Sequence, residues 1–425
     1  MDLDAFDELL TPRGQRALAE AVELVGTDPV AAATRLRKTY DAALTSAALT
    51  QAGLRERARA KFGEDAGRMY FTPHGLEQST RTEVAEHRAR RLPAETQADA
   101  PPHGPDAPPH GLGVADAPLH GPDAPPHGLR RGLRVVDACC GVGGDFLALA
   151  RAGCTVAAVD TDPLTVAVAR ANADALGLAD RVTVSVGDAA EVRPEEYDVL
   201  FADPARRTGR GRTFDPMAYS PPWPVVLDLV SRASRACVKV APGIPYEFIP
   251  GGAEAEWVSY KGEVKEAALW TGQEGAAGRR ATLLPGGHTL TATGAEAAVG
   301  PVGRYVYEPD GAAIRAHLVG EVSEIVNGRL LDPMIAYITG DDPIDTPWAA
   351  RYEVEDVLPF SGKKLRAALR ERQVGNVTIK KRASAVDIER LRSDLRLNGE
   401  KSATIILTRI IDKPSVIICD TSPPA

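Results

Sequence analysis

The sequence has few cysteines, no long apolar run and no basic segment at its amino terminus. Five cysteines in 425 residues are too few for a disulfide framework, and they fit a reducing compartment. No apolar run approaches the roughly 18 to 20 residues that a membrane-spanning helix needs. The first ten residues, MDLDAFDELL, are acidic where a secretory signal would be basic. These absences predict a cytoplasmic protein without a membrane partner.

Negative charge is unevenly distributed along the chain. The formal net charge is -8, yet residues 361–410 contain 13 Lys and Arg against 5 Asp and Glu. That segment therefore carries +8, which leaves -16 for the rest of the chain. A basic segment on an acidic body predicts a polyanionic partner, because cations that neutralise phosphates release bound counterions.

Changes of pattern divide the chain into five parts. Residues 1–98 are rich in Ala, Leu, Arg and Glu near helical spacing, and they predict an N-terminal helical region. Residues 99–128 repeat DAPPHG and predict a disordered Pro/His-rich linker. Residues 129–300 alternate short β-branched runs with helices, which predicts a parallel α/β sheet covered on both faces. A connecting strand-helix module is expected at 301–358, followed by a compact basic α+β domain at 359–425.

Individual elements follow from the same patterns. In the α/β region, strands are expected at 133–138, 155–160, 181–189, 197–204 and 236–242, with two more at 255–262 and 266–272 that would extend one edge. A glycine-rich stretch follows at 272–303. In the basic domain, we expect helices at 361–372 and 385–397 and strands at 375–382, 402–410 and 414–420.

The sequence DACCGVGGD, residues 137–145, follows the first expected strand. Its adjacent cysteines would point to opposite faces and cannot easily share an ion, and nothing fixes tetrahedral geometry for the histidines of the linker, so we expect no metal. No Gly-Lys-Ser/Thr follows the glycines, which excludes a P-loop. Gly141 and Gly143 permit positive φ angles and a close backbone approach to a nucleoside. A tight turn without a ligand is the alternative interpretation.

Four carboxylates follow four successive strands of the expected sheet. Asp137 and Asp160 end the first two strands, and Asp160 stands where a carboxylate can bind both ribose hydroxyls. Asp188 follows the third strand, where it can accept a hydrogen bond from an adenine amino group, and Asp203 follows the fourth. A nicotinamide enzyme would explain Asp160 but not the last two, and Asp162 is interpreted as a helix cap. Together the four predict S-adenosylmethionine as the cofactor.

Residues 133–240 resemble class I S-adenosylmethionine-dependent methyltransferases. DACCGVGGD is similar to the turn of the cap-trimethylguanosine synthases, Asp-x-Phe-Cys-Gly-x-Gly-Gly-Asn, with Cys140 matching and Asp145 in place of the Asn. YFTPHGLEQST resembles the segment that folds over their cofactor, which implies contacts from Phe71 and Thr72. Outside 99–128, the chain also resembles bacterial methyltransferases with a C-terminal THUMP-like domain, in which GLEQSTR, DPARR and YEPDGAAIRA are typical runs.

The resemblance implies an α/β fold: a Rossmann-like class I methyltransferase sheet with an N-terminal helical region and a C-terminal α+β THUMP-like domain. It implies cofactor contacts from Asp137, Cys140, Gly141, Gly143, Asp160, Asp188 and Thr72. Because THUMP domains bind RNA, it also implies an RNA partner, either tRNA or rRNA.

The expected catalytic motif departs from its family. Amino-methylating enzymes of this class carry Asp/Asn-Pro-Pro-aromatic after the fourth strand, whereas this chain has Asp203, Pro204, Ala205 and Arg206. The acceptor oxygens are present, so Asp203 and the Pro204 carbonyl are expected to orient a target base nitrogen. The stacking ring is absent. Trp223 could replace it, although a lone Trp is more often part of the core.

Two groups of cations are candidate RNA contacts. RRTGRGR directly follows the Asp-Pro pair, and guanidinium groups bind phosphate oxygens bidentately. A solvated loop is the alternative interpretation of this run. The expected phosphate contacts are Arg206, Arg207 and Arg210 beside the cofactor crevice, and Lys380, Lys381 and Arg382 in the basic domain.

These observations favour a methyltransferase acting on a base of structured RNA. The missing aromatic ring favours an alternative, a non-catalytic RNA-binding or assembly factor that retains the fold. A small-molecule methyltransferase would leave the basic domain unexplained. A cytosine-C5 mechanism needs a nucleophilic cysteine after proline, a context that neither Cys154 nor Cys237 has.

Overall fold

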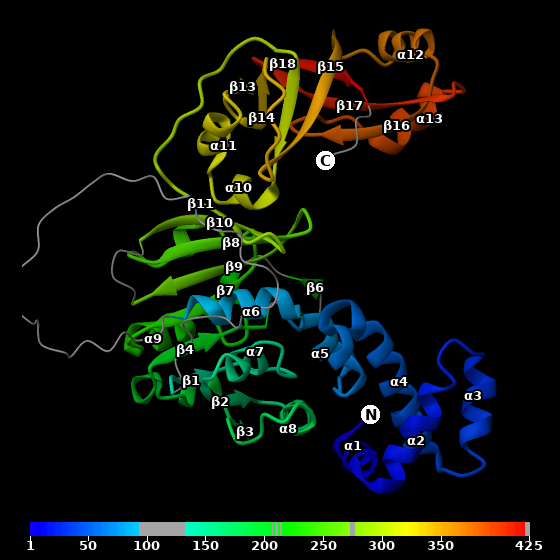
Figure 1. The fold of residues 1–425 in the computed structure, drawn as a ribbon, viewed down its shortest axis with the longest axis vertical. Helices are drawn as coiled ribbons and strands as arrows, with labels where there is room; N and C mark the ends of the chain where they lie inside the picture. The colour runs from blue at the N-terminus through cyan, green and yellow to red at the C-terminus, as the bar shows by residue number, and fades with distance from the viewer. Residues whose placement is uncertain (93–131, 206, 209–210, 213–214, 273–276, 421–425) are drawn as a thin grey trace, which may run out of the picture. The chain divides into compact units, whose positions relative to one another are not determined.

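The computed structural model describes residues 1–92, 132–205, 207–208, 211–212, 215–272 and 277–420 (Figure 1). The chain divides into two compact units, one made of Met1–Ala205 and Tyr219–Ala236, the other of Arg206–Ala218 and Cys237–Ala425. The linker expected at 99–128 lies outside the described residues. In the part of the chain that is described, no helix has both the length and the apolar character to cross a membrane.

The first unit begins with helices, as the sequence predicts. Asp28 caps one of them by accepting a 2.8 Å hydrogen bond from the Ala31 N–H, and Pro29 occupies the first turn. Leu9, Leu18 and Leu44 are among the buried side chains that pack these helices together. The helices are α1 (Leu3–Leu10), α2 (Pro12–Val22), α3 (Pro29–Leu36), α4 (Ala42–Phe62), α5 (Pro73–Gln78) and α6 (Thr82–Arg91).

A parallel sheet follows, which confirms the predicted α/β arrangement. Its strands β1 (Arg134–Asp137), β2 (Thr155–Asp160), β3 (Val182–Val186) and β4 (Val199–Ala202) lie in the order β4-β1-β2-β3. Its helices are α7 (Phe146–Arg151), α8 (Pro163–Ala175) and α9 (Trp223–Arg232). Buried Val136, Leu200 and Leu229 belong to one core cluster between sheet and helices. Because the strands are parallel, the residues that follow them meet at one edge.

Asn172 of α8 joins the N-terminal helices to this sheet. Its side chain is fully buried, and its amide oxygen accepts a 2.6 Å hydrogen bond from the Tyr70 N–H. Its amide nitrogen donates to the carbonyls of Tyr70 at 3.0 Å and Val142 at 2.8 Å. One side chain therefore fixes the chain before α5 and the glycine-rich turn after β1.

The second unit contains a sheet with strand order β11-β10-β8-β9-β7. Its strands are β7 (Ala236–Val240), β8 (Glu254–Tyr260), β9 (Glu263–Thr271), β10 (Gly278–Leu284) and β11 (His288–Thr291), and a short pair is formed by β5 (Arg207–Thr208) and β6 (Gly211–Arg212). The strands predicted near 255–262 and 266–272 are confirmed. Strands β10 and β11 lie within the glycine-rich stretch at 272–303 and were not predicted from the sequence.

A seven-stranded sheet of order β13-β14-β12-β15-β18-β17-β16 completes this unit. The predicted helices and strands of the basic domain are present as α12 (Gly362–Glu371), β16 (Val374–Lys381), α13 (Ile388–Leu395), β17 (Lys401–Ile410) and β18 (Lys413–Cys419). They are preceded by β12 (Tyr305–Pro309), α10 (Gly311–Arg315), α11 (Val319–Ile325), β13 (Arg329–Asp332), β14 (Ile335–Gly340) and β15 (Ala349–Pro359). The boundary expected at 358/359 falls inside β15, which pairs with both β12 and β18.

Replacing Asn172 tests its role in joining the helices to the sheet. Asn172→Ala removes three hydrogen bonds and leaves buried backbone groups unpaired, so the free energy of unfolding should fall by about 2–4 kcal/mol. Urea denaturation of the full chain measures this change. Asp174→Ala, at an exposed position on the same helix, is the control and should stay within about 0.5 kcal/mol of the parent. Equal losses in both variants would contradict the role.

Candidate functional site

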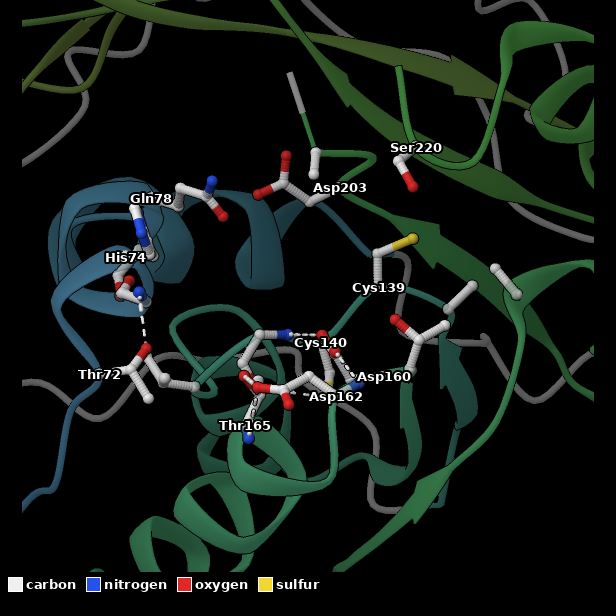
Figure 2. Close-up of a pocket in the computed structure, with 18 of the residues that line it drawn as sticks. Thr72, His74, Gln78, Cys139, Cys140, Asp160, Asp162, Thr165, Asp203 and Ser220 are labelled. Carbon is white, nitrogen blue, oxygen red and sulfur yellow. Dashed lines mark hydrogen bonds between the residues drawn. The ribbon is translucent and has the colours of Figure 1, made fainter. Parts of the chain in front are cut away.

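A cavity of about 620 Å³ lies in the first unit, at the edge where β1, β2 and β4 end (Figure 2). Its walls come from α5, the glycine-rich turn, the ends of the strands and the segment before α9. The structure brings six of the predicted site residues to its surface: Thr72, Cys140, Gly141, Asp160, Asp188 and Asp203. Three others, Asp137, Gly143 and Pro204, are buried and do not line it.

Asp160 is held at the end of β2 by backbone amides. Its two carboxylate oxygens accept hydrogen bonds from Gly141 at 3.1 Å and from Asp162 at 3.0 Å. Burial raises the pKa of the Asp160 carboxyl above its ordinary value, although these amides oppose the shift. Gly141 has φ +52°, and a side chain there would meet open space, which suits close approach of a ligand. This geometry suits the two hydroxyls of a ribose.

Asp137 lies beneath the turn with no exposed surface. One carboxylate oxygen accepts a 3.3 Å hydrogen bond from the Cys139 N–H, whereas Oδ2 has no partner among the described residues. Burial, and then the nearby Asp145 carboxylate, raises the pKa of Asp137 well above its usual range. A positively charged ligand over this turn would offset the cost of the buried acid.

Helix α5 forms the wall opposite the strand ends. Thr72 begins it, and the Thr72 hydroxyl accepts a 2.9 Å hydrogen bond from the Gly75 N–H. The helix approaches the turn so closely that a Cβ at Gly75 would lie 2.3 Å from the Val142 side chain. At its other end, the Lys61 ammonium donates to the carbonyls of Leu76, Glu77 and Ser79.

Phe71, expected to contact the cofactor, points into the core. Its side chain has no exposed surface, and its ring lies 5.4 Å from that of Phe62. Gln51 also holds the Phe71 backbone, since its side chain accepts from the N–H at 3.0 Å and donates to the carbonyl at 2.5 Å. Phe71 therefore does not contact a ligand in the cavity; it anchors the chain just before α5 in the core.

A buried ion pair that the sequence did not reveal lies next to the glycines. Arg88 of α6 donates to Asp145 Oδ1, and the Thr80 hydroxyl donates to Asp145 Oδ2 at 2.7 Å. The Arg88 guanidinium also lies over the Phe201 ring, 5.1 Å from its centroid. Because the partners are 57 and 65 residues from Asp145, no local pattern could have joined them.

Asp203 lies on the cavity wall after β4. The segment from Ser220 to Pro222 also lines the cavity, which the sequence did not predict. The backbones of Ala205 and Ser220 exchange hydrogen bonds of 2.8 and 3.0 Å, which brings Ser220 and the two following prolines to the cavity. Figure 2 labels Asp203, Ser220 and Asp160 among the residues that line the cavity. Trp223 is 3% exposed and packs edge-on against Tyr219, so the interpretation of Trp223 as a core residue is confirmed.

The remaining polar groups at this edge have defined local roles. Asp162 caps α8 by accepting from the Thr165 N–H at 3.0 Å, as the sequence predicts. Asp188 is exposed and accepts a 2.9 Å hydrogen bond from the Ala190 N–H. Burial raises the pKa values of the Cys139 and Cys140 thiols well above the ordinary value, so both are neutral thiols. Among the described residues, no group of three His, Cys, Asp or Glu side chains is placed to hold a metal ion.

The basic-domain side chains that were predicted to contact RNA form ion pairs and hydrogen bonds with other residues of the second unit. The Lys380 ammonium lies 2.5 Å from Glu308 Oε2, and the Arg382 guanidinium lies 3.3 Å from Glu308 Oε1. Lys381 donates to the Val386 carbonyl at 3.0 Å. Arg206 and Arg210 lie outside the described residues, and the backbone of Arg207 pairs with that of Arg212.

The cavity fits the cofactor that the sequence predicts. Asp160 offers acceptors for a ribose, and the unpartnered buried oxygen of Asp137 suits a cationic group such as an ammonium or a sulfonium. The close approach of α5 at Gly75 gives the turn a cover.

Three segments match known families. Residues 133–226 match the RNA cap guanine-N2 methyltransferase family, and residues 349–421 match the THUMP domain-like family. Residues 2–58 match a domain of unknown function.

Similar proteins extend the match to most of the chain. A 23S rRNA (uracil(1939)-C(5))-methyltransferase of Acidithiobacillus ferrooxidans is 36% identical over 81 residues, 18% of each chain. The crystal structure of a Porphyromonas gingivalis W83 protein assigned as a methyltransferase has 20% identity and a TM-score of 0.73, covering 96% of this chain and 99% of the other, which shows a shared fold. An uncharacterized S-adenosylmethionine-dependent methyltransferase of Mycobacterium tuberculosis is 33% identical over 371 residues, 84% of this chain and 90% of the relative. By this last similarity, the chain belongs to the S-adenosylmethionine-dependent methyltransferases, and its predicted cofactor and enzyme class are confirmed.

Proposed function

We propose that this methyltransferase modifies a base nitrogen in structured RNA, either tRNA or rRNA. The observation that carries the proposal is that Asp203, the first residue of the target motif, lines the same cavity as the cofactor residues, and a flipped base would have to reach it there. The match of residues 133–226 to an RNA-modifying family supports it, as does the THUMP-like domain.

The cofactor residues have separate roles in this proposal. Asp160 binds the ribose hydroxyls, Asp188 accepts from the adenine amino group, and Asp137 offsets the positive charge of the ligand. Thr72 and the backbone from Cys140 to Gly143 enclose it. S-adenosylmethionine supplies a methyl group that its sulfonium already activates. The chain therefore needs little acid-base chemistry, and positioning supplies most of the rate.

Asp203 and the Pro204 carbonyl orient the target. Asp203 is an acceptor on the cavity wall and can hold the N–H groups of a base nitrogen with its lone pair toward the methyl group. The Pro204 carbonyl is also an acceptor, but Pro204 is buried and does not line the cavity, so its contact with the base requires a shift of the chain there. The usual stacking ring is missing, and Trp223 is packed in the core. Hydrogen bonds at Asp203 and phosphate contacts outside the cavity would therefore share the positioning of the base.

Phosphate anchoring is assigned to two regions. Arg206, Arg207 and Arg210 follow the target motif in the sequence and are proposed phosphate contacts. In the basic domain, Lys380, Lys381 and Arg382 are proposed contacts, although Glu308 offsets part of their charge. Other cations there are more accessible: Lys363 and Lys364 are exposed on α12.

Replacing Asp160 tests its assigned ribose contact. Asp160→Ala should weaken binding of S-adenosylhomocysteine by about 1.5–3 kcal/mol, the usual value of a hydrogen bond to a charged group. Isothermal titration calorimetry measures this change. Asp198→Ala is the matched control, because Asp198 also accepts a backbone hydrogen bond, at 2.7 Å from Arg134, but does not line the cavity. If the parent and Asp160→Ala bind S-adenosylhomocysteine with equal affinity, Asp160 does not bind the ribose.

Replacing Asp203 tests the target site. Asp203→Ala should abolish methyl transfer to RNA while affinities for RNA and S-adenosylhomocysteine stay within twofold, because this carboxylate is assigned to the reacting base and not to the RNA phosphates or the cofactor. Asp203→Asn keeps an acceptor oxygen and should retain part of the activity. The assay follows transfer of a labelled methyl group to total RNA from cells that lack the protein. A parent protein that binds this RNA without methylating it would instead support the non-catalytic RNA-binding factor.

Charge reversal on α12 tests the basic domain. Lys363→Glu combined with Lys364→Glu should weaken RNA binding and lower the slope of log affinity against log salt, because each lost phosphate contact reduces that slope by about 0.9 on duplex RNA. Filter binding at several salt concentrations gives the slope. The calorimetric affinity for S-adenosylhomocysteine should not change. An unchanged slope would show that α12 does not meet the RNA.

A further inference from the structure

A second cavity, also of about 620 Å³, lies entirely within the second unit. No residue that lines it belongs to the methyl-donor cavity. Its size falls within the range of about 300–1,000 Å³ typical of small-ligand sites. The residues that line it include Tyr246, Trp257, Arg315, His317 and Arg382.

Three aromatic rings form a continuous stack in this cavity. Trp257 is 1% exposed, and its ring lies 5.5 Å from that of Tyr246 at an angle of 25°. The Tyr246 ring lies 4.4 Å from that of His317 at an angle of 21°. The stack therefore runs from the core to an exposed imidazole, on which a further planar ring can stack.

The backbone at His317 has a left-handed conformation. His317 follows the C-cap of α10 and has φ +54°, a conformation that glycine adopts most readily at this position. The Leu318 N–H donates to the Ala313 carbonyl at 2.8 Å, as in a helix that ends through a left-handed residue. Histidine here costs backbone strain that glycine would avoid, and its ring gains the stack on Tyr246.

Charge around the stack favours an anion. Arg315 is exposed, and its guanidinium has no partner among the described residues. Arg382 also lines the cavity, with part of its charge offset by Glu308, whereas none of the lining residues is acidic. Arg279 donates to the His317 carbonyl at 3.3 Å. An aromatic surface bordered by guanidinium groups suits a nucleotide, which combines a planar base with a phosphate.

We propose that this second cavity binds an unpaired nucleotide of the RNA substrate, whose base stacks on His317 and whose phosphate contacts Arg315. The inference rests on the proposed RNA substrate and adds a contact separate from the reacting base. Stacking accepts any base, so this contact would favour single-stranded regions without selecting a sequence.

His317→Gly is the most informative variant. It removes the ring while placing the residue that suits the backbone, so the melting temperature should not fall. Fluorescence anisotropy with the full chain and a short labelled single-stranded RNA should show about tenfold weaker binding, the effect of losing one stacked base. Arg315→Gln should lower the salt slope by about 0.7, one phosphate contact on a single strand. His288→Ala, which removes an exposed imidazole outside the cavity, should change neither quantity.

A competing titration with UMP distinguishes a free nucleotide from an RNA strand. Saturating S-adenosylhomocysteine keeps the methyl-donor cavity filled throughout. Weaker RNA binding in both variants, with UMP at least tenfold weaker than RNA, supports the proposal. RNA affinity that both variants retain overturns it and leaves the RNA methyltransferase function standing, and UMP binding that is as tight as RNA binding assigns the cavity to free nucleotides. A parent protein that binds no RNA overturns both proposals.

Discussion

The ion pair between Arg88 and Asp145 is the contact on which the methyl-donor cavity depends. Both side chains are almost completely buried, and a buried charge that loses its partner costs several kcal/mol. Asp145 closes the glycine-rich turn after β1, whereas Arg88 belongs to α6 of the N-terminal helices. The pair therefore holds those helices against the turn, and with them the α5 wall that begins at Thr72. Asn172 makes the same junction through the backbone on either side.

The two cavities differ in the charge of the side chains around them. Around the methyl-donor cavity, Asp137, Asp160 and Asp203 lie close enough that burial and mutual repulsion raise the pKa of Asp137. Such a site favours a ligand with an ammonium and a sulfonium, and it would repel the pyrophosphate of a nicotinamide cofactor. The second cavity has the opposite character, since Arg315 and Arg382 border it and none of its lining residues is acidic. This difference in charge is what a cationic methyl donor and the proposed RNA acceptor would require.

Local patterns predicted the parallel sheet, the cap at Asp162, and the carboxylates that meet at the strand ends. These features depend on neighbouring residues and on the rule that parallel strands end at one edge. Contacts between residues far apart in the sequence could not be predicted from local patterns. Phe71 turns into the core because Gln51 holds its backbone, and β10 pairs with β8 despite a glycine-rich surrounding sequence. Backbone hydrogen bonds to Ala205 bring the segment at Ser220 to the cavity wall, and such backbone pairing has no signature in the residue types.

The basic domain shows why charge counted along the sequence overstates charge available to a ligand. Lys380 and Arg382 share Glu308, a residue more than 70 positions away that lies outside the basic segment. Together with Glu308, these three consecutive cations carry a net charge of +2, and each paired side chain must leave its partner before it can contact a phosphate. Exposed Lys363 and Lys364 have no such cost. The ion pairs that the fold makes therefore leave this segment with less charge available to a ligand than the net +8 of residues 361–410 suggests.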